Sequence, residues 1–301
     1  MRCVSFGCVL SFGIDLTFFG YLRWASRKQG ATMATVSRRV RCVSVLTASW
    51  LGVCVAVGAA AQQVDGDRQE SPSLTFLYEK PMSPELLELF ETLRDSKILE
   101  AWTGYVNHIL KPLPHRIEAT FAECGKAKSS YDPRRQRITL CYEEVDRSFH
   151  MLSPLGYETE TELLTAWIGS MLFELYHELG HALVDMLWLP VLGKEEDGAD
   201  QFAVIVLLRH TEGWRLVLGN ADYFHEMIAV ETELGPDPSH RHPFFSQRYY
   251  NTLCLTYGSD PEKHKVLVAQ DRLPKARAES CRYEYERAAY AWGAVLEAVE
   301  K

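Results

Sequence analysis

The chain has 301 residues, of which 47% are hydrophobic and 24% are charged. This composition excludes a disordered or fibrous protein and suits one large domain or two small ones. The formal net charge is −8 at pH 7, and it becomes −14 without the first 61 residues, which carry seven basic side chains and one acidic side chain. Because nucleic-acid binding requires a basic surface, so acidic a body predicts no nucleic-acid partner.

The N-terminal segment has the pattern of a secretory signal. Met33 is followed by a cluster of arginines, then by an apolar run, then by small residues that end at Ala61. This order predicts a signal peptide over residues 33–61, cleaved after Ala61, with residues 1–32 as an upstream extension. The alternative is an uncleaved membrane anchor, because residues 43–61 carry no charge. We therefore expect an exported protein, periplasmic or secreted, without stable membrane association once the signal is removed.

The rest of the chain is predicted to form one domain over residues 81–301, preceded by a polar linker over residues 62–80. Ser83 and Pro84 begin a helical pattern that continues in two parts to about Leu110. Two strands follow the helical pattern, and each is recognised from its β-branched and aromatic content.

The two predicted strands cover residues 116–123 and 137–142. Turn residues from Tyr131 to Pro133 lie between them. We therefore expect the two strands to pair as an antiparallel hairpin.

Four of the eight cysteines remain after signal removal, and an even number in an oxidising compartment predicts two disulfides. Four cysteines allow three pairings. We favour the two pairings that close short loops, Cys124–Cys141 across the predicted hairpin and Cys254–Cys281 nearer the C-terminus.

A long helix is predicted over residues 161–187, with apolar residues on most sides, so it should be buried. It carries His177, Glu178 and His181 near its centre, and buried polar groups must be paired or must bind a metal. Gly180 costs about 1 kcal/mol relative to alanine inside a helix. Its presence indicates that the hairpin or the next helix packs closely there.

The next predicted helix begins at Glu195 and ends near Arg209, and mainly helical patterns continue to the C-terminus. Glu196 and Asp200 are four residues apart and therefore share one face of this helix. The two helices together offer two imidazoles and two carboxylates.

These side chains have the spacing of a catalytic zinc site with three protein ligands. His177 and His181 can hold one metal ion, and Glu196 supplies the third ligand, with Glu195 as its main competitor. Asp200 is then placed to accept the N–H of a ligand histidine. We expect one Zn²⁺ per chain.

Glu178 lies beside the metal ligands, where it can act as general base on a water molecule. Peptide hydrolysis also requires a hydrogen-bond donor to the oxyanion. His242 is the first candidate for this catalytic role, followed by His225, Tyr223 and Arg248.

The arrangement of HELGH followed by ExxxD resembles that of the gluzincins, the thermolysin-like zinc peptidases. Segments around Cys124, Cys141, Leu189, Glu195 and Tyr250 are more closely similar to a bacterial family of putative metallopeptidases of unknown function. The resemblance implies an α+β, zincin-like fold, mainly helical, with a small antiparallel sheet packed on the HExxH helix. It also implies that Arg137–Tyr142 is an edge strand that pairs with an extended peptide.

The sequence therefore predicts an exported zinc metallopeptidase that acts on a peptide or protein, in an oligomeric state that the sequence leaves open. One alternative is a non-catalytic metal-binding or partner-binding protein on the same fold. Another is a zinc hydrolase of a non-peptide amide. Glu178 favours a hydrolase, because a purely structural metal site needs no base.

Overall fold

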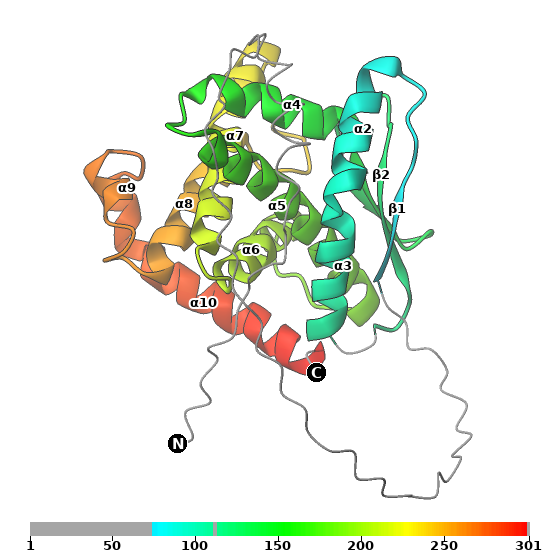
Figure 1. The fold of residues 1–301 in the computed structure, drawn as a ribbon. Helices are drawn as coiled ribbons and strands as arrows, with labels where there is room; N and C mark the ends of the chain where they lie inside the picture. The colour runs from blue at the N-terminus through cyan, green and yellow to red at the C-terminus, as the bar shows by residue number, and fades with distance from the viewer. Residues whose placement is uncertain (1–73, 111–112, 300–301) are drawn as a thin grey trace, which may run out of the picture.

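The computed structural model describes residues 74–110 and 113–299, which fold around one long buried helix (Figure 1). The expected upstream extension, the signal peptide and the first part of the linker lie outside these residues. The strands are β1 (Leu74–Tyr78), β2 (Ile117–Ala122), β3 (Ser130–Asp132) and β4 (Arg137–Cys141). The helices are α2 (Pro84–Ser96), α3 (Ile98–Ile109), α4 (Tyr142–Leu152), α5 (Glu160–Leu187), α6 (Glu195–Leu208), α7 (Gly213–Leu234), α8 (Phe245–Ser259), α9 (Val266–Ala269) and α10 (Lys275–Val299), with a 3-10 turn at Ser153–Leu155.

The sheet is mixed, so the prediction of an antiparallel sheet is wrong. Its strand order is β1-β2-β4-β3, in which β2 is parallel to both neighbours and β3 alone runs antiparallel, against β4. The residues interpreted as the turn of a hairpin, Tyr131 and Asp132, form part of β3. A strand of three residues is too short to show a period-two pattern, which is why the sequence did not reveal it.

Strand β1 lies within residues 62–80, the stretch expected to be an irregular linker. Leu74 pairs with Ile117 at the start of the parallel ladder. The Leu74 backbone N–H donates to Oδ1 of the Asn107 side chain at 2.8 Å, and Nδ2 of the same side chain donates to the Leu74 backbone carbonyl at 2.8 Å. This exchange fixes β1 to α3. Because the residues before position 74 are polar, the whole stretch was interpreted as a linker and the short strand that follows them was not predicted.

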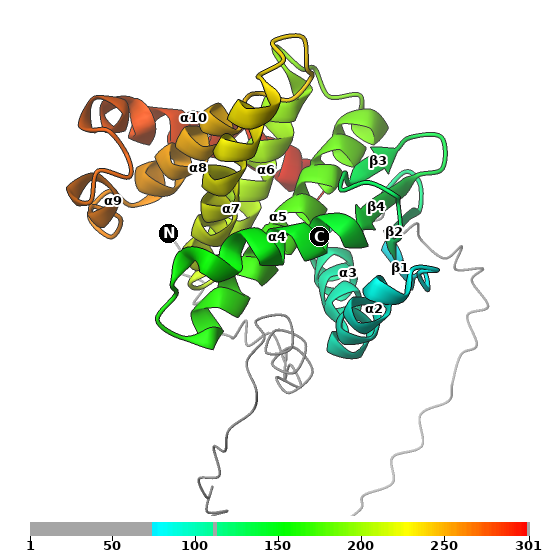
Figure 2. The same cartoon turned by 90° about the horizontal axis from the view of Figure 1, so that it is seen from above.

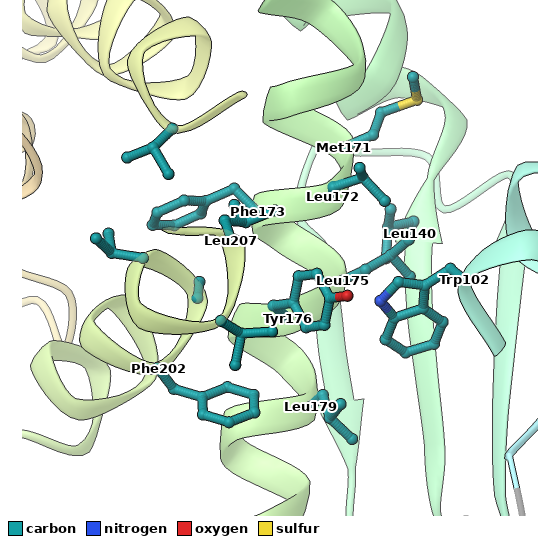
Figure 3. Close-up of a cluster of buried hydrophobic side chains, with 14 of the residues drawn as sticks. Trp102, Leu140, Met171, Leu172, Phe173, Leu175, Tyr176, Leu179, Phe202 and Leu207 are labelled. Atoms are coloured by element: carbon teal, nitrogen blue, oxygen red, sulfur yellow. The ribbon is translucent and has the colours of Figure 1, made fainter. Parts of the chain in front are cut away.

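Helix α5 passes between the sheet and a group of helices formed by α6, α7, α8 and α10 (Figure 2). It begins after Thr159, whose hydroxyl accepts from the Glu162 amide while the Glu162 carboxylate accepts from the Thr159 amide. This capping box places the start slightly before the predicted Thr161. Figure 3 shows Tyr176 of α5 between Trp102 of α3 and Phe202 of α6, with ring centroids 5.9 Å and 6.4 Å away.

Two glycines allow the neighbouring helices to approach α5 closely. A Cβ on Gly180 would lie 3.2 Å from the Cα of Ala199 in α6, and a Cβ on Gly219 of α7 would lie 2.3 Å from the Cα of Ala166 in α5. The close packing expected at Gly180 is therefore made by α6. It brings the first turn of α6 against the centre of α5.

Both favoured disulfides are formed. Cys124 is joined to Cys141 at the end of β4, and Cys254 of α8 is joined to Cys281 of α10. The first pair had been placed in a hairpin that does not exist, yet the parallel neighbours β2 and β4 bring the same residues together. Within the described ranges, every helix is too short or too polar to cross a membrane.

Candidate metal centre

Three polar atoms converge where α5 meets the first turn of α6. The Nε2 atoms of His177 and His181 are 3.2 Å apart, because residues four apart lie on one face of a helix. Oε2 of Glu196 is 3.4 Å from the first nitrogen and 3.2 Å from the second. His177 and Glu196 are 1% and 4% exposed, so the triangle is buried. The three predicted ligands therefore lie together.

Each imidazole is held by a carboxylate through its other nitrogen. Nδ1 of His177 is 2.8 Å from Oδ1 of Asp200, and Nδ1 of His181 is 2.5 Å from Oε1 of Glu195. A carboxylate on Nδ1 fixes the tautomer that leaves a lone pair on Nε2. Asp200 thus lies where the sequence placed it. Glu195, considered as a rival ligand, instead orients His181.

Arg248 of α8 binds Asp200 in a bidentate pair. Its Nε and Nη2 donate to the two carboxylate oxygens at 2.8 Å and 2.7 Å, and both side chains are buried. Burial alone would raise the pKa of the Asp200 carboxyl, but the Arg248 charge and its hydrogen bonds hold that pKa well below its usual range. Arg248 was a candidate oxyanion donor, but its guanidinium is engaged by Asp200.

The charges around the cluster suit a cation. Burial tends to lower the pKa of His177, but hydrogen bonds to Asp200 and Glu196 raise it to about 10. The pKa of the Glu196 carboxyl is held well below its usual range, because its bonds to both histidines outweigh burial. These carboxylates therefore favour positive charge at the cluster, which a divalent cation would supply on binding.

The geometry also suits zinc. Tetrahedral ligands about 2.0–2.2 Å from a zinc ion lie roughly 3.3–3.6 Å from one another. The edges of the triangle, between 3.2 Å and 3.4 Å, lie close to the lower end of that range. Glu143, Cys124 and Cys141 form a second group of possible metal ligands. Because the two cysteines are joined in a disulfide, this group has no thiolate to offer.

Glu178 lies beside the triangle and is 5% exposed. Its carboxylate accepts a hydrogen bond from the backbone N–H of Tyr131 in β3, and burial raises the pKa of the carboxyl. Glu178 lines a cleft of about 350 Å³ between α4, α5, α7 and the loop before α8. The predicted base is therefore buried but reaches a cleft of the size that a peptide side chain would need.

The strand expected to bind an extended peptide is not at the edge of the sheet. Arg137–Cys141 forms β4, which lies between β2 and β3, and Tyr142 begins α4. The edge beside α5 is β3 instead. Its Tyr131 touches α5 twice, through the N–H bonded to Glu178 and through a hydroxyl that donates to Asp185 at 3.0 Å.

Among the candidate oxyanion donors, His242 lies at the cluster. Its Nδ1 is 3.2 Å from Oε2 of Glu196, and its ring stacks on that of His177 with centroids 6.1 Å apart. The ligand atoms of His177, Glu196 and His242 all lie within 4.8 Å of one another, so His242 could also reach a metal ion. The pKa of His242 is lowered to about 4, chiefly by burial.

The other two candidates lie away from the ligands. Tyr223 is buried beneath the cleft, and His225 is exposed and contacts Glu226 at 3.2 Å. The sequence missed the contact of Tyr131 with Glu178, and it also missed Arg241, whose guanidinium is 3.3 Å from Oε1 of Glu196. Tyr131 and Arg241 are far from α5 and α6 in the sequence or lie outside their helical period. Only the folding of the chain brings them to the site, so no sequence spacing could have predicted these contacts.

Comparison with models of protein families matches residues 78–296 to a family described as "Putative metallopeptidase". Comparisons with curated proteins and with solved structures return no match. The matched range begins at the end of β1, ends within α10 and contains every residue of the cluster. Since it spans well over half of the sequence, this chain belongs to that family of putative metallopeptidases, as its motifs led us to expect.

Proposed function

We propose that the protein is a zinc-dependent peptidase of zincin-like fold and gluzincin-like ligand set, with one zinc ion per chain. The observation that carries the proposal is the buried triangle of His177, His181 and Glu196 with Glu178 beside it. Each histidine has a carboxylate on its outer nitrogen, an arrangement that supports metal binding and costs affinity when it is removed.

When bound, zinc would polarise the scissile carbonyl and lower the pKa of a water molecule next to it. Glu178 would accept the proton of the attacking water and pass it to the leaving amine. Its raised pKa suits this exchange, because a general base and acid works best with a pKa near the working pH. A purely structural site would not require this carboxyl.

His242 would donate a hydrogen bond to the oxyanion that forms as water attacks. Its imidazole lies within reach of Glu196 and stacks on His177, which supports a position from which it would face the reacting carbonyl. The outer edge of β3 would hold an extended peptide by strand addition next to Glu178. Ser130–Asp132 takes the place that we had expected Arg137–Tyr142 to fill.

We propose that the enzyme works outside the cytoplasm. Two disulfides, Cys124–Cys141 and Cys254–Cys281, fit an oxidising compartment. The signal pattern over residues 33–61 points the same way. A peptide or protein is the expected substrate.

The test compares the wild-type protein with Glu178→Gln and His177→Ala. Wild type should bind one zinc per chain and cleave members of a peptide library, and a chelator should abolish cleavage. Glu178→Gln should keep its zinc and lose hydrolysis, whereas His177→Ala should lose zinc. Glu160→Gln, on an exposed first turn of the same helix, is the matched control.

Three results would reject the proposal or replace it. Retained hydrolysis in Glu178→Gln would reject the general base. A full zinc content in His177→Ala would reject that ligand. Zinc binding without cleavage of any peptide would favour a non-catalytic metal protein or a hydrolase of another amide.

A further inference from the structure

At its deep end, the cleft beside Glu178 contains a carboxyl that has no hydrogen-bond or ion-pair partner among the described residues. Glu174 lies one helical turn before Glu178 and lines the same cleft. Within residues 74–110 and 113–299, the Glu174 carboxylate forms no hydrogen bond and no ion pair. Glu174 is half-buried. A carboxyl withdrawn from water without a partner is costly, so a carboxyl kept in this position indicates a ligand that would pair with it.

A second unpartnered group lies beneath it. Tyr223 of α7 is 2% exposed, and among the described residues no group lies within hydrogen-bond distance of its hydroxyl, although the Arg147 charge is near. Tyr223 and Glu174 share a void of about 10 Å³ with Glu144 of α4, and both glutamates also line the cleft above. Glu144 already accepts from the backbone N–H and the hydroxyl of Ser129, at 2.7 Å and 2.6 Å. In the described part of the chain, the groups left without a partner at the deep end are therefore the Glu174 carboxyl and the Tyr223 hydroxyl.

The cations that line the cleft have other partners. Arg248 gives two hydrogen bonds to Asp200. Arg147 forms an ion pair with Glu144 at 3.7 Å and donates to the Ala127 carbonyl at 3.1 Å. Lys128 is exposed at the rim. Within the described ranges, the acidic side chain left without a direct partner at the deep end is thus Glu174.

The walls of the cleft are suited to the stem of a long side chain. Met227 and Val230 of α7 line one side together with Phe245. A lysine or arginine packs its methylene groups on an apolar surface and directs its charged end to polar groups. An ammonium group has three donors, which can serve the Glu174 carboxylate and the Tyr223 hydroxyl.

We propose that this cleft is a specificity subsite for a lysine or arginine side chain of the substrate, with Glu174 as its main charge partner and Glu144 and Tyr223 beside it. The proposal rests on the peptidase function proposed above, since the subsite opens next to Glu178. Burial and the neighbouring Glu144 raise the pKa of Glu174 to about 8, so an incoming cation would favour its ionised form.

The test uses peptide pairs that differ in one residue next to the scissile bond, lysine in one and norleucine in the other. Norleucine keeps the stem and lacks the charge. Wild type should favour lysine in kcat/KM, and Glu174→Gln should lower that preference roughly 30-fold at unchanged zinc content, as expected for the loss of one partner of a buried charge pair. Glu160→Gln should keep the full preference.

A binding measurement separates this inference from the peptidase function. Calorimetry with zinc-loaded Glu178→Gln protein should give tighter binding of the lysine peptide, and adding Glu174→Gln should remove the difference. A lysine preference in binding without cleavage by wild type would reject the peptidase and support the subsite. Equal binding of the two peptides, or a preference for a glutamate peptide, would overturn the subsite whether or not cleavage occurs.

Discussion

Glu195 and Glu196 are consecutive in the chain, yet their carboxylates reach opposite nitrogens of the same imidazole. Oε1 of Glu195 is 2.5 Å from Nδ1 of His181, and Oε2 of Glu196 is 3.2 Å from Nε2. A rotation of about 100° between neighbouring helical residues makes this possible at the first turn of α6. One glutamate therefore orients His181, and the other faces the metal position that we propose.

The first prediction concerns metal affinity. Glu195→Gln removes the anion on Nδ1 of His181, so we expect the affinity for zinc to fall about 10- to 100-fold without loss of folding. Competition with a chromophoric chelator measures it. Asp197→Asn is the matched control, because Asp197 lies on the same turn but lines two pockets that contain neither His177 nor His181. Equal affinities in wild type and Glu195→Gln would contradict the role of Glu195.

The second prediction concerns the buried pair of Arg248 and Asp200. Arg248→Met leaves the Asp200 carboxylate buried without its cation, so the free energy of unfolding should fall by about 3–5 kcal/mol. Denaturant unfolding of the zinc-free protein measures this change directly. Arg282→Met removes an exposed partner of Glu286 and should have little effect. A double variant with Asp200→Leu should recover part of the loss, and strictly additive losses would refute the coupling.

The third prediction concerns the packing of α7 on α5. A Cβ on Gly219 would lie 2.3 Å from the Cα of Ala166, so Gly219→Ala should destabilise the fold by about 1–3 kcal/mol. Gly104 in α3 has no atom within 4 Å of the same position. Gly104→Ala should instead stabilise the fold by about 0.5–1 kcal/mol. Thermal unfolding of both variants measures the contrast, and a neutral Gly219→Ala would contradict the close approach.

The fourth prediction concerns acid stability. Burial, with the nearby Arg209 charge, lowers the pKa of His210 from 6.5 to about 4. Between pH 4 and pH 6.5, His210 binds a proton in the unfolded chain but not in the folded chain. Acidification from pH 6.5 to 4 should therefore reduce stability by roughly 3 kcal/mol through this residue, and the loss should reverse as pH rises.

The measurement for His210 is the free energy of unfolding of wild type and His210→Gln at several pH values. The difference between the two proteins isolates this histidine from the other titrating groups. The two curves should diverge below pH 6.5. Parallel curves would contradict the low pKa of His210.

The sequence by itself determined the two helices of the site and the residues that face each other within each helix. His177 with His181 follows from a fixed helical period, as does Glu196 with Asp200, because residues four apart lie on one face. The long apolar pattern of α5 also predicted its burial. The pairing of Cys254 with Cys281 was favoured because short loops close at lower entropic cost.

Only the tertiary structure decided how these helices meet and what surrounds them. The sheet order, the edge strand β3 and the contact of Tyr131 with Glu178 depend on pairings between distant segments, which no local period records. The same holds for Arg248 on Asp200 and for His242 over Glu196, which reach the site from α8 and the loop before it. Local periodicity fixes the faces of single helices, whereas close packing, as at Gly180 and Ala199, fixes which faces come together.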